Sequence, residues 1–152
     1  MKKLTLVTVT RDNKILLGYK KRGFAQGNWN GFGGKVEAGE GVQESALREL
    51  KEECGISPRQ IFQRGILNFY NPFNSGEELE VHLFVVNDFA GEPQESDEVR
   101  PEWFTFENIP YDSMWVDDRY WLPLILKGES INGEFHFGLN NEIVKYKVNI
   151  LK

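Results

Sequence analysis

The sequence predicts one α/β domain in which a mixed β-sheet is flanked by helices. Two observations carry this prediction. Short runs of β-branched and apolar residues recur between turn signals along the chain, and one segment spaces its apolar residues at helical intervals. The 152 residues contain no repeat, low-complexity stretch or linker, so we expect a single domain over residues 1–152.

Strands are expected wherever β-branched or apolar residues run between turns. Residues 4–10 alternate, and Arg11-Asp12-Asn13 turns the chain into a second strand at residues 14–19, which predicts a hairpin. The other expected strands cover residues 31–36, 61–70, 79–88, 103–106, 131–137 and 143–150. Residues 20–30 form a basic loop and residues 90–100 an acidic one.

A helix is expected over residues 42–54, because Val42, Ala46, Leu50 and Cys54 recur at every fourth position and form one apolar stripe. Gly55 follows directly and favours a helix stop. A second helix is expected over residues 117–127. Asp117 is a plausible N-cap there, and Pro123 is expected to end or kink that helix.

The first helix carries a cluster of carboxylates beside its apolar stripe. At roughly 100° per residue, Glu49 and Glu53 lie about 40° apart on the edge of the stripe, with Glu52 just beyond. Carboxylates that converge at such an edge repel one another unless a hard cation with oxygen ligands holds them together. Arg48 can pair with one of them and fix its orientation.

Residues 34–56 read GKVEAGEGVQESALRELKEECGI. The run resembles, without a missing position, the Nudix hydrolase signature Gly-x5-Glu-x7-Arg-Glu-apolar-x-Glu-Glu-x-Gly-apolar. A solvated Glu-rich helix face is the alternative, but Glu40 and the two glycines stand at the distances that the signature requires. The resemblance implies an α/β/α sandwich and metal-assisted hydrolysis of a nucleoside diphosphate linked to another group.

The same resemblance implies a site for Mg²⁺, with Mn²⁺ as the alternative ion. Its ligands would be the carbonyl of Gly33 and the carboxylates of Glu49, Glu52, Glu53 and Glu98. Glu53 or Glu98 would accept the proton of the attacking water, Arg48 would belong to the catalytic set, and Glu40 would support the site from its edge.

Three further segments resemble the MutT-type oxidised purine nucleoside triphosphatases: KKRGFAQGNWNGFGGKV at 20–36, SDEVRPEWF at 96–104 and MWVDDRYWLPLIL at 114–126. The likeness implies hydrolysis of substrates such as 8-oxo-dGTP or 2-hydroxy-dATP to a nucleoside monophosphate and pyrophosphate. In this sequence Asn30, Asp117 and Asp118 would read the purine edge, and Trp115 would stack on the base. The remaining substrate-binding residues that it implies are Thr5, Lys20, Phe24, Phe32, Gly33, Gly34 and Lys35.

The sequence departs from the mammalian members at two positions of this second likeness. Val116 stands in place of a proline, and Asn71 stands where they have a second aromatic residue beside the pocket. Both departures concern the pocket floor and the base preference, and neither touches the residues of the reaction.

Each predicted pocket residue could instead have a purely structural role. Asp117 could only cap a helix, Asn30 could be a turn residue, and Trp115 and Trp121 could be core aromatics, which we favour for Trp121. For the whole chain, the alternatives are hydrolysis of another nucleotide (a housekeeping dNTP, ADP-ribose or an RNA 5′ end) and a catalytically silent Nudix-fold binding module. Silent modules typically lose the signature carboxylates, all of which are present here.

Bulk properties limit the expected partners and location. The net charge of −5 gives no basic footprint for duplex nucleic acid. The only cysteine, Cys54, excludes an internal disulfide and is compatible with a reducing cytosol. The N-terminal run MKKLTLVTVT alternates like a strand rather than a signal peptide, and no segment approaches a membrane span. We expect a cytoplasmic monomer that acts on a small nucleotide.

Overall fold

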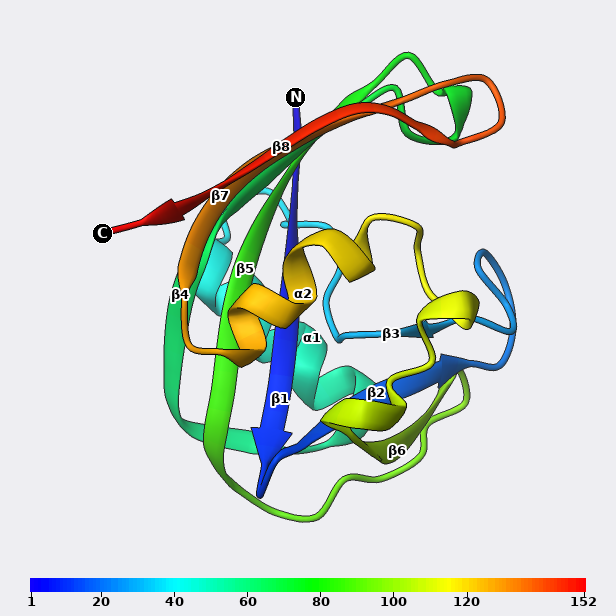
Figure 1. The fold of residues 1–152 in the computed structure, drawn as a ribbon. Coiled ribbons are helices and arrows are strands. Elements are labelled where there is room, and N and C mark those ends of the chain that lie inside the picture. Colours follow the sequence, from blue (N-terminus) through cyan, green and yellow to red (C-terminus); the bar gives the residue numbers. More distant parts are fainter.

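The computed structural model describes all residues, 1–152, as one curved eight-stranded sheet with a helix on each face (Figure 1). The strands are β1 (Lys2–Arg11), β2 (Lys14–Lys20), β3 (Trp29–Asn30), β4 (Ser57–Tyr70), β5 (Glu78–Ala90), β6 (Val99–Thr105), β7 (Ser130–Phe137) and β8 (Ile143–Leu151). The helices are α1 (Val42–Cys54) and α2 (Asp118–Leu126).

The sheet has the order β3-β2-β1-β5-β4-β7-β8, and β6 pairs with β2 off this path. The pairs β1·β5 and β4·β7 are parallel and the others antiparallel, which confirms the mixed sheet. The predicted hairpin of β1 and β2 is present. Asp12 and Asn13 both have positive φ, at 52° and 60°, as the short hairpin turns that match strand twist require.

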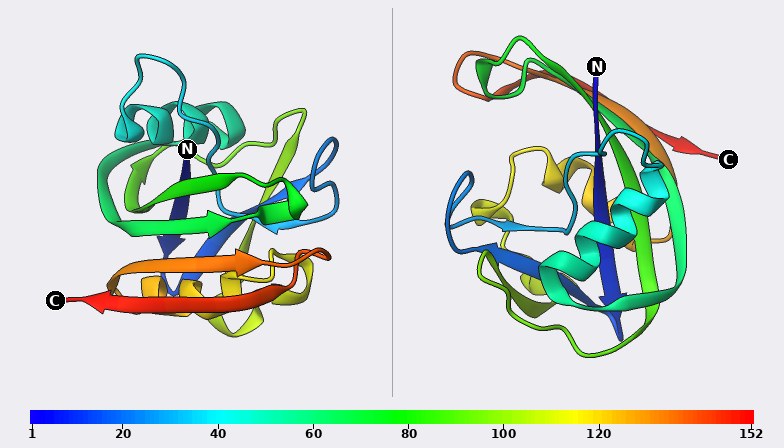
Figure 2. Two further views of the ribbon diagram at one scale, coloured as in Figure 1. Left: turned by 90° about the horizontal axis from the view of Figure 1, so that it is seen from above. Right: turned by 180° about the vertical axis from the view of Figure 1, so that it is seen from behind.

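The helices cover opposite faces of the sheet, which gives the expected α/β/α sandwich. α2 lies in front of the central strands in Figure 1, and α1 crosses behind them, as the view from behind in Figure 2 shows. Of its predicted stripe, α1 buries Ala46, Leu50 and Cys54 against residues of β1, β5 and β6, and Val42 packs on the same cluster but is only partly buried. The interpretation of Cys54 as a core residue is confirmed.

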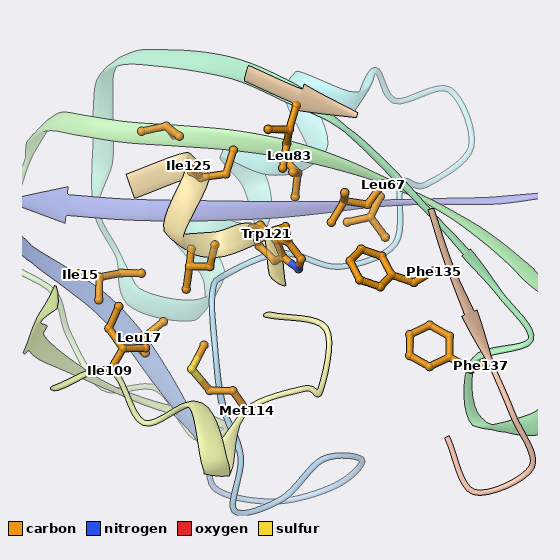
Figure 3. Packing of buried hydrophobic residues seen from close by; sticks show 14 residues of the cluster. Ile15, Leu17, Leu67, Leu83, Ile109, Met114, Trp121, Ile125, Phe135 and Phe137 are labelled. Atoms are coloured by element: carbon orange, nitrogen blue, oxygen red, sulfur yellow. The ribbon is translucent and has the colours of Figure 1, made fainter. Parts of the chain in front are cut away.

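The second core packs α2 against the other face of the sheet. Trp121 is 2% exposed and lies at the centre of this cluster, between Leu83, Phe135 and Met114 (Figure 3). The favoured interpretation of Trp121 as a core aromatic is therefore confirmed. α2 continues through Pro123 to Leu126, so the proline does not end the helix.

The strand predicted at residues 31–36 is wrong. The residues that pair with β2 precede this range, at Trp29–Asn30. Within it, Phe32 and Lys35 make only isolated bridges to β1. The cause lies at Gly33, whose N–H leaves the ladder and donates to a side chain of α1. β4 and β6 begin earlier than predicted, at Ser57 and Val99. No helix in the structure combines the length and apolar character needed to cross a membrane.

Candidate active site

α1 places its carboxylates against the loop that follows β3. The helix begins after Gly41, whose N–H donates to the Glu44 side chain at 3.3 Å, and it ends at Gly55 in the left-handed conformation (φ 77°). Burial of the Ala46, Leu50 and Cys54 stripe fixes the rotation of the helix about its axis. That rotation aims the next positions along the helix edge at the glycines of the loop.

Glu53 is anchored to this loop. The Gly33 N–H donates to Glu53 Oε1 at 2.8 Å. Burial, reinforced by repulsion from Glu49 and opposed by that hydrogen bond, raises the pKa of the Glu53 carboxyl to about 7. A Cβ on residue 33 would lie 1.9 Å from the Thr5 carbonyl oxygen, so the close approach of loop and strand requires glycine.

Arg48 gathers the other acidic side chains. Its Nε and Nη2 donate to both carboxylate oxygens of Glu40, at 2.7 and 3.1 Å. Its Nη1 donates to Glu49 at 2.9 Å and to Glu52 at 3.2 Å, and Nη2 reaches the Lys35 carbonyl at 3.2 Å. The forked hydrogen bond lowers the pKa of Glu40 to about 2 and raises the pKa of Arg48. Glu40 therefore braces the arginine.

The second part of the site is a cavity of about 350 Å³ on the α2 side of the sheet. Its walls come from β1, the loop after β2, the turn after β4, the segment before α2 and the β7–β8 hairpin. Of the predicted binding residues, it is lined by Thr5, Lys20, Phe24, Asn30, Gly33, Gly34, Trp115, Asp117 and Asp118, and Glu53 also reaches it. Folding therefore brings together nine of the eleven predicted substrate-binding residues, whereas Arg48, Glu49, Glu52 and Glu98 do not line the cavity.

Phe32 and Lys35 lie elsewhere. Phe32 is 1% exposed, packs in the core beneath α1 and borders only a second cavity of about 30 Å³. That cavity, large enough for one water, shares the lining residues Lys20, Asn30 and Glu53 with the larger cavity. The main-chain carbonyl of Lys35 accepts hydrogen bonds from Arg48 Nη2 and Ser45 Oγ.

Asp117 and Asp118 form a buried pair of carboxyl groups in the cavity wall, each 4% exposed. Trp121 Nε1 donates to Asp117 Oδ2 at 2.8 Å, and the Asp117 side chain makes no capping bond to α2. Asp117 thus occupies the N-cap position, as expected, but its side chain bonds to Trp121 and does not cap the helix. Burial raises the pKa of both groups, and repulsion from Asp117 helps to raise that of Asp118 well above its usual value.

Two polar atoms that face this region have no partner. Asn30 Oδ1 and Thr5 Oγ1 are buried and make no hydrogen bond. Asn30 belongs to β3 and is therefore not a turn residue. Buried polar groups are nearly always paired in folded proteins, so a polar ligand is the simplest partner for them.

An aromatic residue that the sequence did not single out completes the mouth. Trp115 lies 6.0 Å from Phe24, with the rings nearly parallel, and 5.1 Å from Phe73, edge to face. Phe73 lies in the turn after β4. In this turn the sequence indicated only that Asn71 replaces the aromatic residue that mammalian members have beside the pocket. The only sign in the sequence was the presence of Phe73 in a turn. It did not reveal this role, because the direction of the side chain depends on a turn conformation that residue spacing does not encode.

Residues 2–125 match the NUDIX domain family. This match includes the α1 carboxylates and most of the cavity wall. The chain belongs to the Nudix family.

Two curated relatives match almost end to end. The oxidized purine nucleoside triphosphate hydrolase of Danio rerio is 44% identical over 97% of this chain and 94% of the relative. Its counterpart from Mus musculus is 43% identical over 95% and 92%. The solved structure of a MutT protein from Bacillus halodurans superposes with a TM-score of 0.84 at 27% identity, and covers 98% of each chain.

Nudix hydrolases use a divalent metal ion, and the residues of α1 fit one. Glu49 and Glu53 offer oxygen ligands, and burial raises the pKa of both carboxyls, which a cation would offset. Gly34 lets the Glu49 carboxylate lie against the main chain of the loop, since a Cβ there would lie 2.7 Å from Glu49 Oε1. No three acidic side chains are gathered as a ready-made cluster, because Arg48 holds Glu52 and Lys20 Nζ lies 3.4 Å from Glu98.

Proposed function

We propose that this Nudix hydrolase converts oxidised purine nucleoside triphosphates, such as 8-oxo-dGTP or 2-hydroxy-dATP, to nucleoside monophosphate and pyrophosphate, and so sanitises the nucleotide pool. The observation that carries the proposal is the buried pair Asp117 and Asp118, which shares one cavity with the unpartnered Asn30 Oδ1. The names and near-complete coverage of the fish and mouse relatives support it.

The carboxyl pair suits oxidised purines because oxidation changes which edge atoms donate and accept. A protonated carboxyl donates and an ionised one accepts, while Asn30 offers both kinds of atom. Burial raises the pKa of both carboxyls, which favours a state in which the pair keeps a proton. A mixed state of this kind can match more than one purine edge, which supports a broad oxidised-purine range.

We propose that Mg²⁺ is the metal, with Mn²⁺ as the alternative, held by Glu49, Glu52, Glu53, Glu98 and the Gly33 carbonyl. When bound, a divalent ion polarises the phosphate chain and lowers the pKa of water. Recruitment of Glu52 and Glu98 requires their ion pairs with Arg48 and Lys20 to loosen.

The side chains of the protein then supply positioning and proton transfer. Glu53 is the proposed proton acceptor, with Glu98 as the alternative, because the Gly33 N–H donates to Glu53 and fixes its position. Arg48, braced by Glu40, orients Glu49. Lys20 borders both the base cavity and the small cavity beside Glu53, so its charge can offset that of the phosphates.

The decisive experiment compares kcat/KM for 8-oxo-dGTP, 2-hydroxy-dATP, dGTP and ATP with Mg²⁺ and with Mn²⁺. We expect the oxidised nucleotides to be preferred and pyrophosphate to be released. ADP-ribose and a 5′-triphosphate RNA belong in the same panel, since ADP-ribose yields AMP and ribose phosphate without pyrophosphate. Preference for either of them would replace the proposed substrate, and turnover of none would favour a binding module.

We also propose a cytoplasmic monomer that does not bind duplex nucleic acid. Support comes from the net charge of −5 and the single, buried, unpaired Cys54. Light scattering of the purified protein tests the monomer, and a filter-binding titration with duplex DNA tests the absence of binding.

A further inference from the structure

The turn after β4 has an unusual backbone. Asn71, Phe73 and Asn74 all have positive φ, at 59°, 55° and 53°. Asn enters the left-handed region readily, but a bulky residue such as phenylalanine is a true outlier there. Such conformations persist only where surrounding contacts over-determine them, and they cluster at ligand clamps.

Those contacts come from the far end of the chain. The Phe73 N–H donates to Asn141 Oδ1 at 2.6 Å, from the β7–β8 hairpin. Asn71 Nδ2 donates to the Phe137 carbonyl at 3.2 Å, and Asn71 Oδ1 accepts from the Gly76 N–H at 2.8 Å. The hairpin thus fixes the direction in which the Phe73 ring points.

The ring points at the mouth of the nucleotide cavity. Its centroid lies 5.1 Å from that of Phe24 and 5.1 Å from that of Trp115, edge to face in both cases. Phe73 and Phe24 nevertheless remain 46% and 70% exposed, so the aromatic frame is open on one side. Asp117, two residues after Trp115, lies in the same cavity wall.

We infer that Phe73 is a substrate-binding residue, which closes the mouth over the purine base and holds the base against Trp115. Asn141 is its positioning residue. The inference rests on the proposed function, because it takes a purine nucleotide as the occupant. Phe73 thereby supplies, from a different position and by a different backbone route, the pocket-side aromatic that Asn71 does not provide.

Binding of the product nucleotide 8-oxo-dGMP, measured by calorimetry without catalysis, tests this role. Phe73→Gly removes the ring and leaves a residue for which positive φ is easy, so it separates the ring from the backbone. We expect about 10-fold weaker binding in Phe73→Gly and Phe73→Ala, as is typical for loss of an aromatic contact to a base. Phe73→Tyr should bind like the unmodified protein.

Two controls assign the loss to the base. Inorganic pyrophosphate has no base, so its inhibition constant should not change in Phe73→Gly. Phe62→Ala removes another partly exposed phenylalanine, outside the cavity, and should bind 8-oxo-dGMP normally.

Unchanged 8-oxo-dGMP binding by Phe73→Gly, or a parallel loss of pyrophosphate inhibition, would overturn the role of Phe73. The proposed function fails in a different way, through an unmodified protein that does not turn over 8-oxo-dGTP. Asn141→Ala should weaken 8-oxo-dGMP binding less than Phe73→Gly, because it loosens the ring without removing it.

Discussion

The edge of α1 and the cavity on the α2 side of the sheet differ in how their polar groups are paired. At the α1 edge the charged groups bind one another, with Arg48 shared among Glu40, Glu49 and Glu52. In the cavity, by contrast, Asn30 Oδ1 and Thr5 Oγ1 have no partner. The first region is arranged to hold a fixed geometry before any ligand arrives, whereas the second keeps hydrogen-bonding capacity for one. Substitutions at the α1 edge should therefore change the rate for all substrates alike, and those in the cavity should change the choice among them.

The largest effect is expected from Glu53→Gln. The amide oxygen can still accept from the Gly33 N–H, but it cannot accept the proton, so kcat should fall about 10²–10⁴-fold while the fold survives. Steady-state kinetics and circular dichroism of the same sample check both points. Glu44→Gln is the matched control on the same helix and should retain full turnover. Near-normal kcat in Glu53→Gln would remove the acceptor role.

The next effect is expected in the cavity. Asp117→Ala should raise KM for 8-oxo-dGTP about 10–100-fold, because the base loses a buried hydrogen-bonding partner. Glu98→Ala should raise KM much less. Asp117→Asn keeps the acceptor for Trp121 Nε1 and so controls for packing. If Asp117→Ala and Glu98→Ala raised KM equally, Asp117 would not read the base.

A smaller effect is expected at the brace. Arg48→Lys cannot make the forked bond to Glu40, so Glu49 should lose its fixed orientation and kcat/KM should fall by about 10-fold for every nucleotide tested. If the fall in kcat/KM differed between nucleotides with different bases, the α1 edge would also affect the choice of substrate, and the proposed division of roles would be contradicted. Lys51→Ala, on the exposed face of α1, should leave kcat/KM unchanged.

The same division explains what the sequence could predict. Arg48, Glu49, Glu52 and Glu53 lie within one helix, where helical spacing alone predicts their mutual positions. Asn30, Trp115 and Asp117 were identified only through resemblance, because their meeting depends on the order of strands in the sheet.

Phe73 was not identified at all. Its direction is set by a hydrogen bond to Asn141, which is 68 residues away, and by a left-handed backbone that propensity argues against. The strand misplaced at residues 31–36 has a related cause, since the Gly33 N–H is taken by Glu53 from α1. Local patterns fail where a distant side chain competes for the main chain.

The smallest effect concerns the pH dependence of folding stability. It tests whether the buried carboxyl of Asp118 in the cavity wall destabilises the fold when it ionises. Burial raises the pKa of Asp118 well above its usual value, so the folded protein prefers the protonated carboxyl. The unfolded chain titrates near the ordinary Asp value of about 3.9. The stabilisation due to Asp118 is therefore complete below about pH 3.9 and is lost as pH rises through the raised pKa of the folded state.

Asp118→Asn keeps the shape of the side chain but cannot ionise, so it should remove this loss. Melting curves from pH 4 to 8 should show the variant gaining on the unmodified protein as pH rises, by roughly 2–4 °C in Tm for each kcal/mol recovered. Glu53 titrates in both proteins and cancels from the difference. Asp112→Asn, at a fully exposed side chain, should show no such trend. If the unmodified protein instead gained stability over Asp118→Asn with rising pH, the carboxyl would be ionised in the fold, and the contrast between a satisfied α1 edge and a ligand-seeking cavity would not extend to its charges.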